Sequence, residues 1–290
     1  MDLFGEEISQ FAARSIESLY LALSGLFTPA IIFLLLGFIV KRAVLIRDMR
    51  RAARESGLNV SIMAFNTVFV MPGLAVLAQA LHELNTSWGL QLLDADSWEV
   101  LHPVVVILIA VFLGDFVGYW RHRFEHTPLL WPSHAVHHSD TEMTWLTLER
   151  FHPINRFTTY FIDAVALLVL GLPPYALVAN GFVRHYYGYL IHADLPWTYG
   201  RFAAIFVSPA MHRWHHAADP RAFNTNYATV FSFFDRVFGT LRVPGLCTVP
   251  LGVTDEMKES LAGQLSYAFT RRAYAPLLRR LRSSRRNTDQ

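Results

Sequence analysis

Eight of the thirteen histidines in this 290-residue chain fall into three short clusters. The first cluster has the spacing HxxxH, and the second and third both have the spacing HxxHH. Their members are His122 and His126, then His134, His137 and His138, and finally His212, His215 and His216. Residues three or four positions apart lie on one face of a helix, so each cluster can direct all of its imidazoles toward one point. Because imidazole is a ligand of zinc, copper, iron and nickel, this spacing predicts a metal site.

The number of clustered histidines indicates more than one metal ion. Eight ligands exceed the three or four that a single zinc ion takes, and they suit two metals with some coordination positions left open. The only cysteine, Cys247, excludes a cysteine-rich zinc module and a cysteine-held iron–sulfur cluster. Ligand type alone leaves the choice between iron and zinc open. The unclustered His82, His102, His152 and His185 are expected to be ordinary hydrogen-bonded residues.

The elements that must position these clusters are predicted to be membrane helices. Hydrophobic residues make up 53% of the chain and charged residues only 17%, against ~25% charged in an average soluble domain. Three long runs are almost free of charge: Ser18–Val40, Ser56–Leu81 and Val100–Trp120, where Asp115 is the only acid. Each run is long enough to cross the ~30 Å core of a bilayer. Buried helices of a soluble domain are the alternative, but such helices usually keep a polar face.

The distribution of charge predicts how the three runs are oriented. The loop between the first two runs carries six basic residues and two acidic ones: Lys41, Arg42, Arg47, Arg50, Arg51 and Arg54 against Asp48 and Glu55. An excess of Lys and Arg marks a loop as cytoplasmic. The third run therefore delivers the histidine clusters to the cytoplasmic side, and we expect an integral, multi-pass membrane protein with its metal site there.

A fourth apolar stretch, Ala164–Val183, is interrupted by Gly171-Leu-Pro-Pro174, where a helix should break. The second and third histidine clusters must lie on the same side of the membrane to share a site. This requirement favours a hairpin, with Phe157–Leu170 leading out and Tyr175–Ile191 returning. His192 then lies beside the clusters as a candidate ninth ligand.

The predicted fold is an all-α membrane protein with about four to five transmembrane helices, one of them a proline-broken hairpin. A cytoplasmic helical cap carries the multi-histidine di-metal site. We expect membrane helices and a basic cytoplasmic loop in residues 1–99, a histidine-box catalytic core in 100–245, and a helix with a basic tail in 246–290.

The residues around the histidines add a resemblance to a known family. In chain order they are Tyr119-Trp-Arg-His122, Trp131-Pro-Ser-His134, Arg150-Phe-His-Pro153, His192-Ala-Asp194, Ser208-Pro-Ala-Met-His212, Asn226-Tyr227 and Phe234-Asp-Arg236. Over residues 100–242 the chain resembles the fatty acid hydroxylase/sterol desaturase superfamily of membrane-embedded di-iron oxygenases. It departs from that pattern at Phe234, Ala228 and Asp194, where Trp, Gly and Asn are more usual. None of these departures removes a histidine.

The resemblance implies two iron ions held by the nine histidines, with O₂ as co-substrate. The expected reaction is hydroxylation or desaturation of a C–H bond in a sterol, fatty acyl or alkyl lipid. Because the chain carries no heme, flavin or iron–sulfur motif, electrons are expected from a separate reductase or small redox protein. The expected partners are therefore the lipid substrate, the membrane and this electron donor, with no nucleic acid. The lipid, and the choice between alcohol and alkene as product, stay open.

Two further residues and two rival functions complete the prediction. Asp115 lies seven residues before His122 on the same helix face and is a candidate to orient a ligand, while Arg150 can bind a headgroup or brace a loop. His122, Glu125 and His126 also satisfy HxxEH, the signature of a single-zinc hydrolase in which the glutamate activates water. A divalent-metal transporter is the second rival, although transport favours polar residues distributed through several membrane spans.

Overall fold

The computed structural model describes residues 3–275 and 277–279 of the chain. Within those residues all regular secondary structure is helical, and the β pairing consists of one isolated bridge between Ala217 and Leu251. Two helical stretches, Ser9–Trp88 and Pro103–Glu125, are long and apolar enough to cross a membrane. The all-α prediction is therefore confirmed for the described residues.

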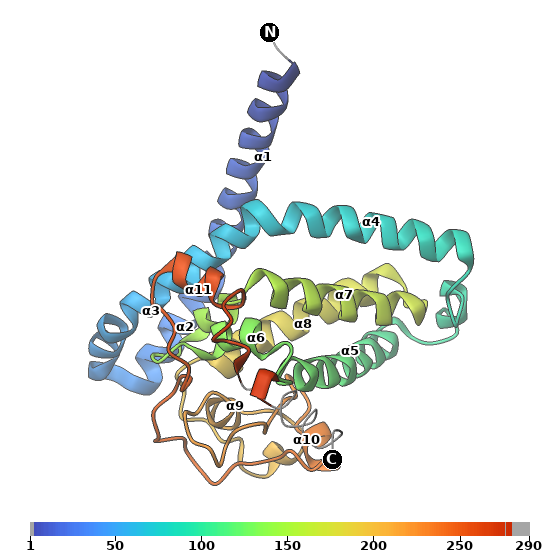
Figure 1. The fold of residues 1–290 in the computed structure, drawn as a ribbon. Helices are drawn as coiled ribbons and strands as arrows, with labels where there is room; N and C mark the ends of the chain where they lie inside the picture. The colour runs from blue at the N-terminus through green and yellow to red at the C-terminus, as the bar shows by residue number, and fades with distance from the viewer. Residues whose placement is uncertain (1–2, 276, 280–290) are drawn as a thin grey trace, which may run out of the picture.

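The N-terminal region is a chain of helices interrupted at Leu26, at residues 42–44 and at residues 66–70. Helix α1 (Leu3–Gly25) extends away from the rest of the molecule, and α2 (Phe27–Lys41) follows after a break at Leu26 (Figure 1). The predicted run Ser18–Val40 is thus shared between two helices. On α2, Leu35, Phe38 and Ile39 are each more than half exposed, as suits a surface that faces lipid.

The second predicted run, Ser56–Leu81, is also divided. It spans the end of α3 (Leu45–Phe65), a π-helical turn η2 (Asn66–Val70) and the start of α4 (Met71–Trp88), and the short η1 (Arg42–Val44) precedes α3. Pro72 explains the interruption, because it has no N–H to donate to the preceding turn. After the π turn, α4 runs beside α7 (Figure 1).

The third predicted run forms α5 (Pro103–Glu125), preceded by the short η3 (Ala95–Trp98). The predicted arms of the hairpin are α7 (Pro153–Val169) and α8 (Pro174–His192), separated by a turn over residues 170–173. Both arms pack chiefly against α5. Gly114 and Gly118 allow α8 to lie close to α5, since a methyl group at either position would meet the side chain of Asn180 or Arg184.

A buried ion network also joins these three helices. Arg121 of α5 contacts Asp163 of α7 at 2.9 Å, and Arg184 of α8 contacts the other carboxylate oxygen of Asp163 at 2.9 Å. Arg121 also pairs with Glu125 one turn further along α5, at 2.7 Å. Each buried charge therefore has an opposite partner, which offsets the cost of removing it from water.

The histidine-rich cap is built from short helices at one end of this bundle. They are α6 (Trp131–His138), η4 (Trp145–Glu149), η5 (Gly200–Ala204), α9 (Pro209–His215), α10 (Phe233–Val237) and α11 (Leu261–Tyr267). Tyr119 on α5 anchors the cap, because its ring packs against Tyr227 and Phe238. Its hydroxyl lies 3.0 Å from the hydroxyl of Thr240.

Candidate metal centre

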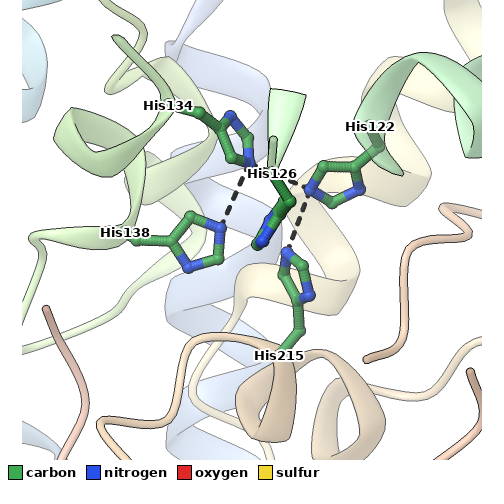
Figure 2. A group of neighbouring side chains, drawn as sticks. All are labelled: His122, His126, His134, His138 and His215. Carbon is green, nitrogen blue, oxygen red and sulfur yellow. Dashed lines mark hydrogen bonds between the residues drawn. The ribbon is translucent and has the colours of Figure 1, made fainter. Parts of the chain in front are cut away.

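The nine predicted histidines come together in two groups, and within each group the candidate ligand nitrogens lie within 4.8 Å of one another. The first group contains His122, His126, His134, His138 and His215, which Figure 2 shows pointing toward one another from three different helices. The second group contains His137, His192, His212 and His216. The structure thus brings together histidines from the C-terminal ends of α5 and α8 and from α6 and α9. These histidines span 95 residues of the sequence, from His122 to His216.

The two HxxHH clusters do not each point at a single place, which corrects the simplest prediction from their spacing. On α6, His134 and His138 join the first group and His137 joins the second. On α9 the division is reversed, since His212 and His216 join the second group and His215 the first. Helix geometry explains this division. Residues i and i+4 are ~40° apart around the axis, whereas i+3 and i+4 are ~100° apart.

Within the first group, Nε2 of His122 lies 2.9 Å from Nε2 of His215 and 3.0 Å from Nε2 of His134. His138 approaches Nε2 of His134 at 3.1 Å. The second group repeats this arrangement, with Nε2 of His192 3.1 Å from that of His137 and 3.0 Å from that of His212. The same ring nitrogen therefore points inward in each of these residues.

The opposite nitrogen, Nδ1, is held from behind in four of the rings. His122 donates to the backbone carbonyl of Tyr227 at 2.7 Å, and His215 donates to that of Thr225 at 2.6 Å. His192 donates to the carbonyl of Gly188, one turn earlier on α8, at 2.7 Å. His134 donates to the side-chain oxygen of Asn155 at 3.0 Å.

These outer contacts decide which nitrogen of each ring carries the proton. A backbone carbonyl can only accept, so Nδ1 carries the hydrogen in His122 and His215, and a neutral ring then presents a lone pair at Nε2. The rings are neutral, because burial lowers the pKa of His134 and His215 to about 3. Burial also holds the pKa of His138 and His216 well below the ordinary value of 6.5. Lone pairs thus face one another at 2.9–3.0 Å, an arrangement that a cation stabilises.

Several nitrogens of these rings make no hydrogen bond to any described residue. They are Nε2 of His126, Nδ1 of His137 and His212, and both ring nitrogens of His216. An unpaired buried polar atom costs ~1–3 kcal/mol. One metal ion ligated by Nε2 of His126 and a second ligated by one nitrogen of His216 would give those atoms partners. The donor set therefore fits two metal ions.

Two buried carboxylates hold the loop that carries the Tyr227 carbonyl. Asp235 accepts from the backbone N–H of Tyr227 at 2.7 Å and of Ala228 at 3.0 Å, and from the hydroxyl of Thr240 at 2.6 Å. Asp115 accepts from the next three backbone N–H groups, those of residues 229–231, at 2.7–3.1 Å. Asp115 was expected to orient a histidine directly. Instead, its side chain extends from α5 toward this loop and binds residues 229–231, next to the Tyr227 carbonyl that orients His122.

Arg150 braces the second histidine cluster and shows no sign of a headgroup role. The residue is 1% exposed, and its guanidinium contacts Glu55 at 2.5 Å and Asn59 at 3.2 Å, both on α3. Its Nε donates to the carbonyl of Val136 at 3.1 Å, between His134 and His137. The arginine therefore ties α6 to α3.

The other histidines have the ordinary roles expected of them. His102 caps the first turn of α5, and His152 caps that of α7 while also contacting the carbonyl of Leu265 at 2.9 Å. His82 is exposed on α4, and His185 lies beside a cavity between α1 and α8.

Sequence reasoning missed three residues at the site. Asn155 follows the Arg150-Phe-His-Pro153 segment and is the side chain that orients His134. Phe151 stacks on the ring of His137, with centroids 4.9 Å apart and an interplanar angle of 10°. Asp235 belongs to a motif already noted in the sequence, but the sequence does not show that it binds backbone N–H groups of the loop. Of the three, Asn155 was the easiest to predict from the sequence, because it is a polar residue next to the Arg150–Pro153 segment.

Glu125, the proposed base of a single-zinc hydrolase, is engaged elsewhere. One of its oxygens accepts from Arg121 at 2.7 Å, and the other accepts from the hydroxyl of Thr158 at 2.8 Å. Its nearest ring atom, Nδ1 of His134, is 3.7 Å away on the outer side of that imidazole. The carboxylate therefore lies on the side of His134 that faces away from the Nε2 atoms of the first group.

Comparison with known proteins agrees with this site. The fatty acid hydroxylase family profile matches residues 107–240. The chain is 29% identical over 211 residues to an ornithine lipid hydroxylase of Rhizobium tropici, covering 72% of this chain and 61% of that protein. It is 35% identical over 132 residues to an alkylglycerol monooxygenase of Danio rerio and 30% identical over 133 residues to one of Homo sapiens. These matches cover 44% and 45% of this chain and 29% of each relative. The chain thus spans less than two thirds of the length of these relatives, and no solved structure matches it significantly.

Proposed function

We propose, from the premise that the chain belongs to the fatty acid hydroxylase/sterol desaturase superfamily, that it is a membrane-bound, di-iron, O₂-dependent oxidoreductase. Its reaction is hydroxylation or desaturation of a C–H bond in a lipid. The relatives just described are lipid hydroxylases and monooxygenases, and family members are membrane proteins. The apolar helices of this chain suit the same environment.

The observation that carries the proposal is the pair of facing Nε2 atoms of His122 and His215. Neither can donate a hydrogen bond to the other, because both Nδ1 atoms donate to backbone carbonyls. Two nitrogens at right angles around one ion, each ~2.1 Å from it, lie ~3.0 Å apart. The observed 2.9 Å separation suits adjacent ligands of one metal.

The proposed ligands are His122, His126, His134, His138 and His215 for one iron, and His137, His192, His212 and His216 for the other. Irons bound there would supply the O₂-dependent redox chemistry that attack on an unactivated C–H bond requires. The chain itself keeps the imidazoles out of water, and the contacts at Nδ1 leave the Nε2 atoms of four rings deprotonated: His122, His134, His192 and His215. Its surroundings supply the electrons, through a separate reductase or redox protein.

The membrane arrangement is part of the proposal. The basic loop at residues 41–54 is assigned to the cytoplasm, and α5 then brings the first cluster to that side. The turn between α7 and α8 returns the chain to the side from which it came, so that His192 meets His212. Such a hairpin supports the metal site on the cytoplasmic face.

Two observations weigh against the rival functions. A single-zinc hydrolase would leave the second histidine group unused, and its base, Glu125, already binds Arg121 and Thr158. In a metal transporter, ligands would follow one another along a path through the spans. Here nine histidines gather at one end of the bundle instead.

Metal analysis of the detergent-purified chain tests the proposal. We expect two irons per chain and an O₂-dependent oxidised lipid when a reductant is supplied. One zinc per chain with hydrolytic activity would overturn it. Lipid analysis of cells with and without the gene, repeated after complementation, would then identify the product class.

A further inference from the structure

A cavity of about 460 Å³ lies between α2, α3 and the segments 142–146 and 193–195. Its volume is within the range of ligand pockets in proteins, ~300–1,000 Å³. None of the nine candidate ligands lines it, but Asp194 comes two residues after His192, and Arg213 directly follows His212. The cavity therefore adjoins the second histidine group.

Part of the cavity wall is apolar and reaches the surface of α2. Phe33 and Leu34 line it together with Met143 and Trp145, and the rings of Phe33 and Trp145 stack with their centroids 5.6 Å apart. Leu34 is 49% exposed on the helix whose outer surface suits lipid. An alkyl chain can therefore enter from the bilayer and bury its surface along α2.

The charged residues of the wall form one connected network with a net charge of zero. Three are basic and three are acidic: Lys41, Arg51 and Arg213 against Asp48, Glu142 and Asp194. Lys41 contacts Asp48 at 2.9 Å and also contacts Asp194, which in turn lies 3.1 Å from Arg213. Arg51 extends the network from Asp48, at 4.0 Å, to Glu142, at 2.7 Å.

Three side chains of this network are accessible to a ligand in the cavity. Those of Asp194 and Glu142 are 34% and 30% exposed, and that of Arg51 is 56% exposed. Arg51 binds Glu142 through Nε, whereas its Nη2 is 4.0 Å from Asp48, beyond hydrogen-bond distance. The network therefore offers two carboxylates as acceptors and a guanidinium nitrogen as a donor.

These charges favour a headgroup that carries both signs. A purely anionic headgroup would lie beside the carboxylates of Asp194 and Glu142, and a purely cationic one would lie beside Arg51, and contacts between like charges are costly. An uncharged headgroup avoids this repulsion but makes only half of each charge-assisted hydrogen bond. A zwitterion makes such bonds with charge on both sides, and hydrogen bonds that involve charge are about twice as strong as neutral ones.

The position of the network along α2 also suits a headgroup. Lys41 is the last residue of α2, and the proposed membrane arrangement places that end at the cytoplasmic boundary. Phe33 and Leu34 lie about two turns earlier, inside the bilayer. A lipid of the cytoplasmic leaflet would therefore have its headgroup and its acyl chain level with the matching parts of the cavity.

We propose that this cavity binds a membrane lipid with a zwitterionic headgroup. The ammonium group contacts Asp194 and Glu142, the anionic group contacts Arg51, and one acyl chain lies against Phe33 and Leu34. This inference goes beyond the proposed function, because binding requires neither iron nor turnover.

Crosslinking with a phosphatidylethanolamine that carries a diazirine in one acyl chain tests the inference. The full chain in detergent is used without reductant, so that no turnover occurs. We expect crosslinks to α2 near Phe33 and to residues 143–146. Unlabelled phosphatidylethanolamine should compete about tenfold better than phosphatidylglycerol or diacylglycerol with the same acyl chains, the ratio expected for one charge-assisted hydrogen bond. Equal competition by either of these lipids, or crosslinks only to other segments, would overturn the inference.

Two variants of accessible residues test the headgroup contacts. Glu142→Gln leaves the network with a net positive charge, so phosphatidylglycerol should compete as well as phosphatidylethanolamine. Arg51→Gln removes the donor for the anionic group and should weaken competition by phosphatidylethanolamine about tenfold, with that by diacylglycerol unchanged. Arg54→Gln is the matched control, because Arg54 is also exposed on α3 but lies outside the cavity. Unaltered headgroup preference in both cavity variants would contradict the assignment.

A third variant tests the apolar part of the cavity. Ala30 lines this part, so Ala30→Trp should fill it and weaken binding of phosphatidylethanolamine and diacylglycerol alike, by about tenfold. Leu35→Trp is the control, because Leu35 is 56% exposed on α2 and does not line the cavity. Equal binding by these two variants would show that the acyl chain lies elsewhere and would overturn the inference.

Discussion

Nε2 of His122 and Nε2 of His215 lie 2.9 Å apart, although the two residues are 93 positions apart in the sequence. Each ring donates its other nitrogen to a backbone carbonyl, that of Tyr227 for His122 and that of Thr225 for His215. One short loop thus fixes both imidazoles with their lone pairs facing each other. The metal site depends as much on this loop as on the histidines.

Adjacent histidines on α9 belong to different groups, and this gives a direct test of the two-metal site. His215→Ala removes a ligand of the first group, and His216→Ala removes one of the second. We expect each variant to fall from two irons per chain toward one, and the double variant to hold almost none. Iron content after purification measures this.

His82→Ala is the control for that series, since His82 is exposed on α4 and belongs to neither group. It should retain both irons. Two irons per chain in either His215→Ala or His216→Ala would count against the division of ligands between two metals.

The division of the HxxHH clusters marks a limit of prediction from sequence. Spacing identified eight of the nine histidines, because metal ligands must be of a particular type and helical periodicity is local, and the predicted hairpin added His192. It did not show that His137 and His138 serve different metals, because that depends on where α6 lies relative to α8 and α9. The carbonyl acceptors behind His122, His215 and His192 could not be predicted, since every residue has a carbonyl.

The course of the backbone was predicted in a similar, partial way. The proline-broken hairpin was visible in the sequence, because Pro173 and Pro174 interrupt an apolar run and α8 begins there. The break at Leu26 and the π turn after Phe65 were not predicted, because both runs are free of charge and were interpreted as continuous spans, although Pro72 lies within the second run. Hydrophobicity shows that a segment is buried or faces lipid, but it does not show where a helix bends.

Arg150→Met should destabilise the fold, because it removes the buried partner of Glu55 and leaves that carboxylate only the exposed Arg54, at 3.2 Å. Glu55 is 4% exposed, and Arg150 is its 2.5 Å contact. Loss of one partner of such a pair costs ~3–5 kcal/mol. We therefore expect a clearly lower melting temperature in detergent, together with reduced iron, because the bond to the Val136 carbonyl is lost as well.

The double variant Glu55→Gln with Arg150→Met distinguishes the charge effect from the packing effect. Removing the charge of Glu55 as well should restore part of the lost melting temperature. Equal melting temperatures for the single and double variants would show that the charge of Glu55 does not cause the destabilisation by Arg150→Met.

Asp235 predicts a pH dependence of stability. Burial raises the pKa of this carboxyl to about 6 from an ordinary value of 3.8. Its contribution to stability is therefore fully present below about pH 4 and is lost as pH rises through about 6. Asp235→Asn cannot titrate, so the stability of the unmodified chain relative to this variant should fall by about 1 kcal/mol between pH 5 and pH 8. Parallel unfolding free energies across that range would contradict the raised pKa.

Gly171→Ala should be the most damaging small substitution in the hairpin. Gly171 has a φ of 66°, and a methyl group there would lie 1.8 Å from the backbone oxygen of Leu93. The left-handed conformation alone costs ~1–2 kcal/mol for a residue with a side chain, and the clash must move the turn. Because α7 carries Asn155 and α8 carries His192, a displaced turn disturbs both histidine groups. Melting temperature and iron content should therefore both fall.

Gly181→Ala is the matched substitution on α8, where no atom lies within 4 Å of the added methyl group. Alanine is ~0.8–1.0 kcal/mol more favourable than glycine inside a helix, so this variant should melt at the same temperature or slightly higher and keep its iron. The contrast isolates the turn, since both changes add one methyl group to the same hairpin. If Gly171→Ala matched Gly181→Ala in melting temperature and iron content, the turn would not be what aligns His192 with the rest of the site.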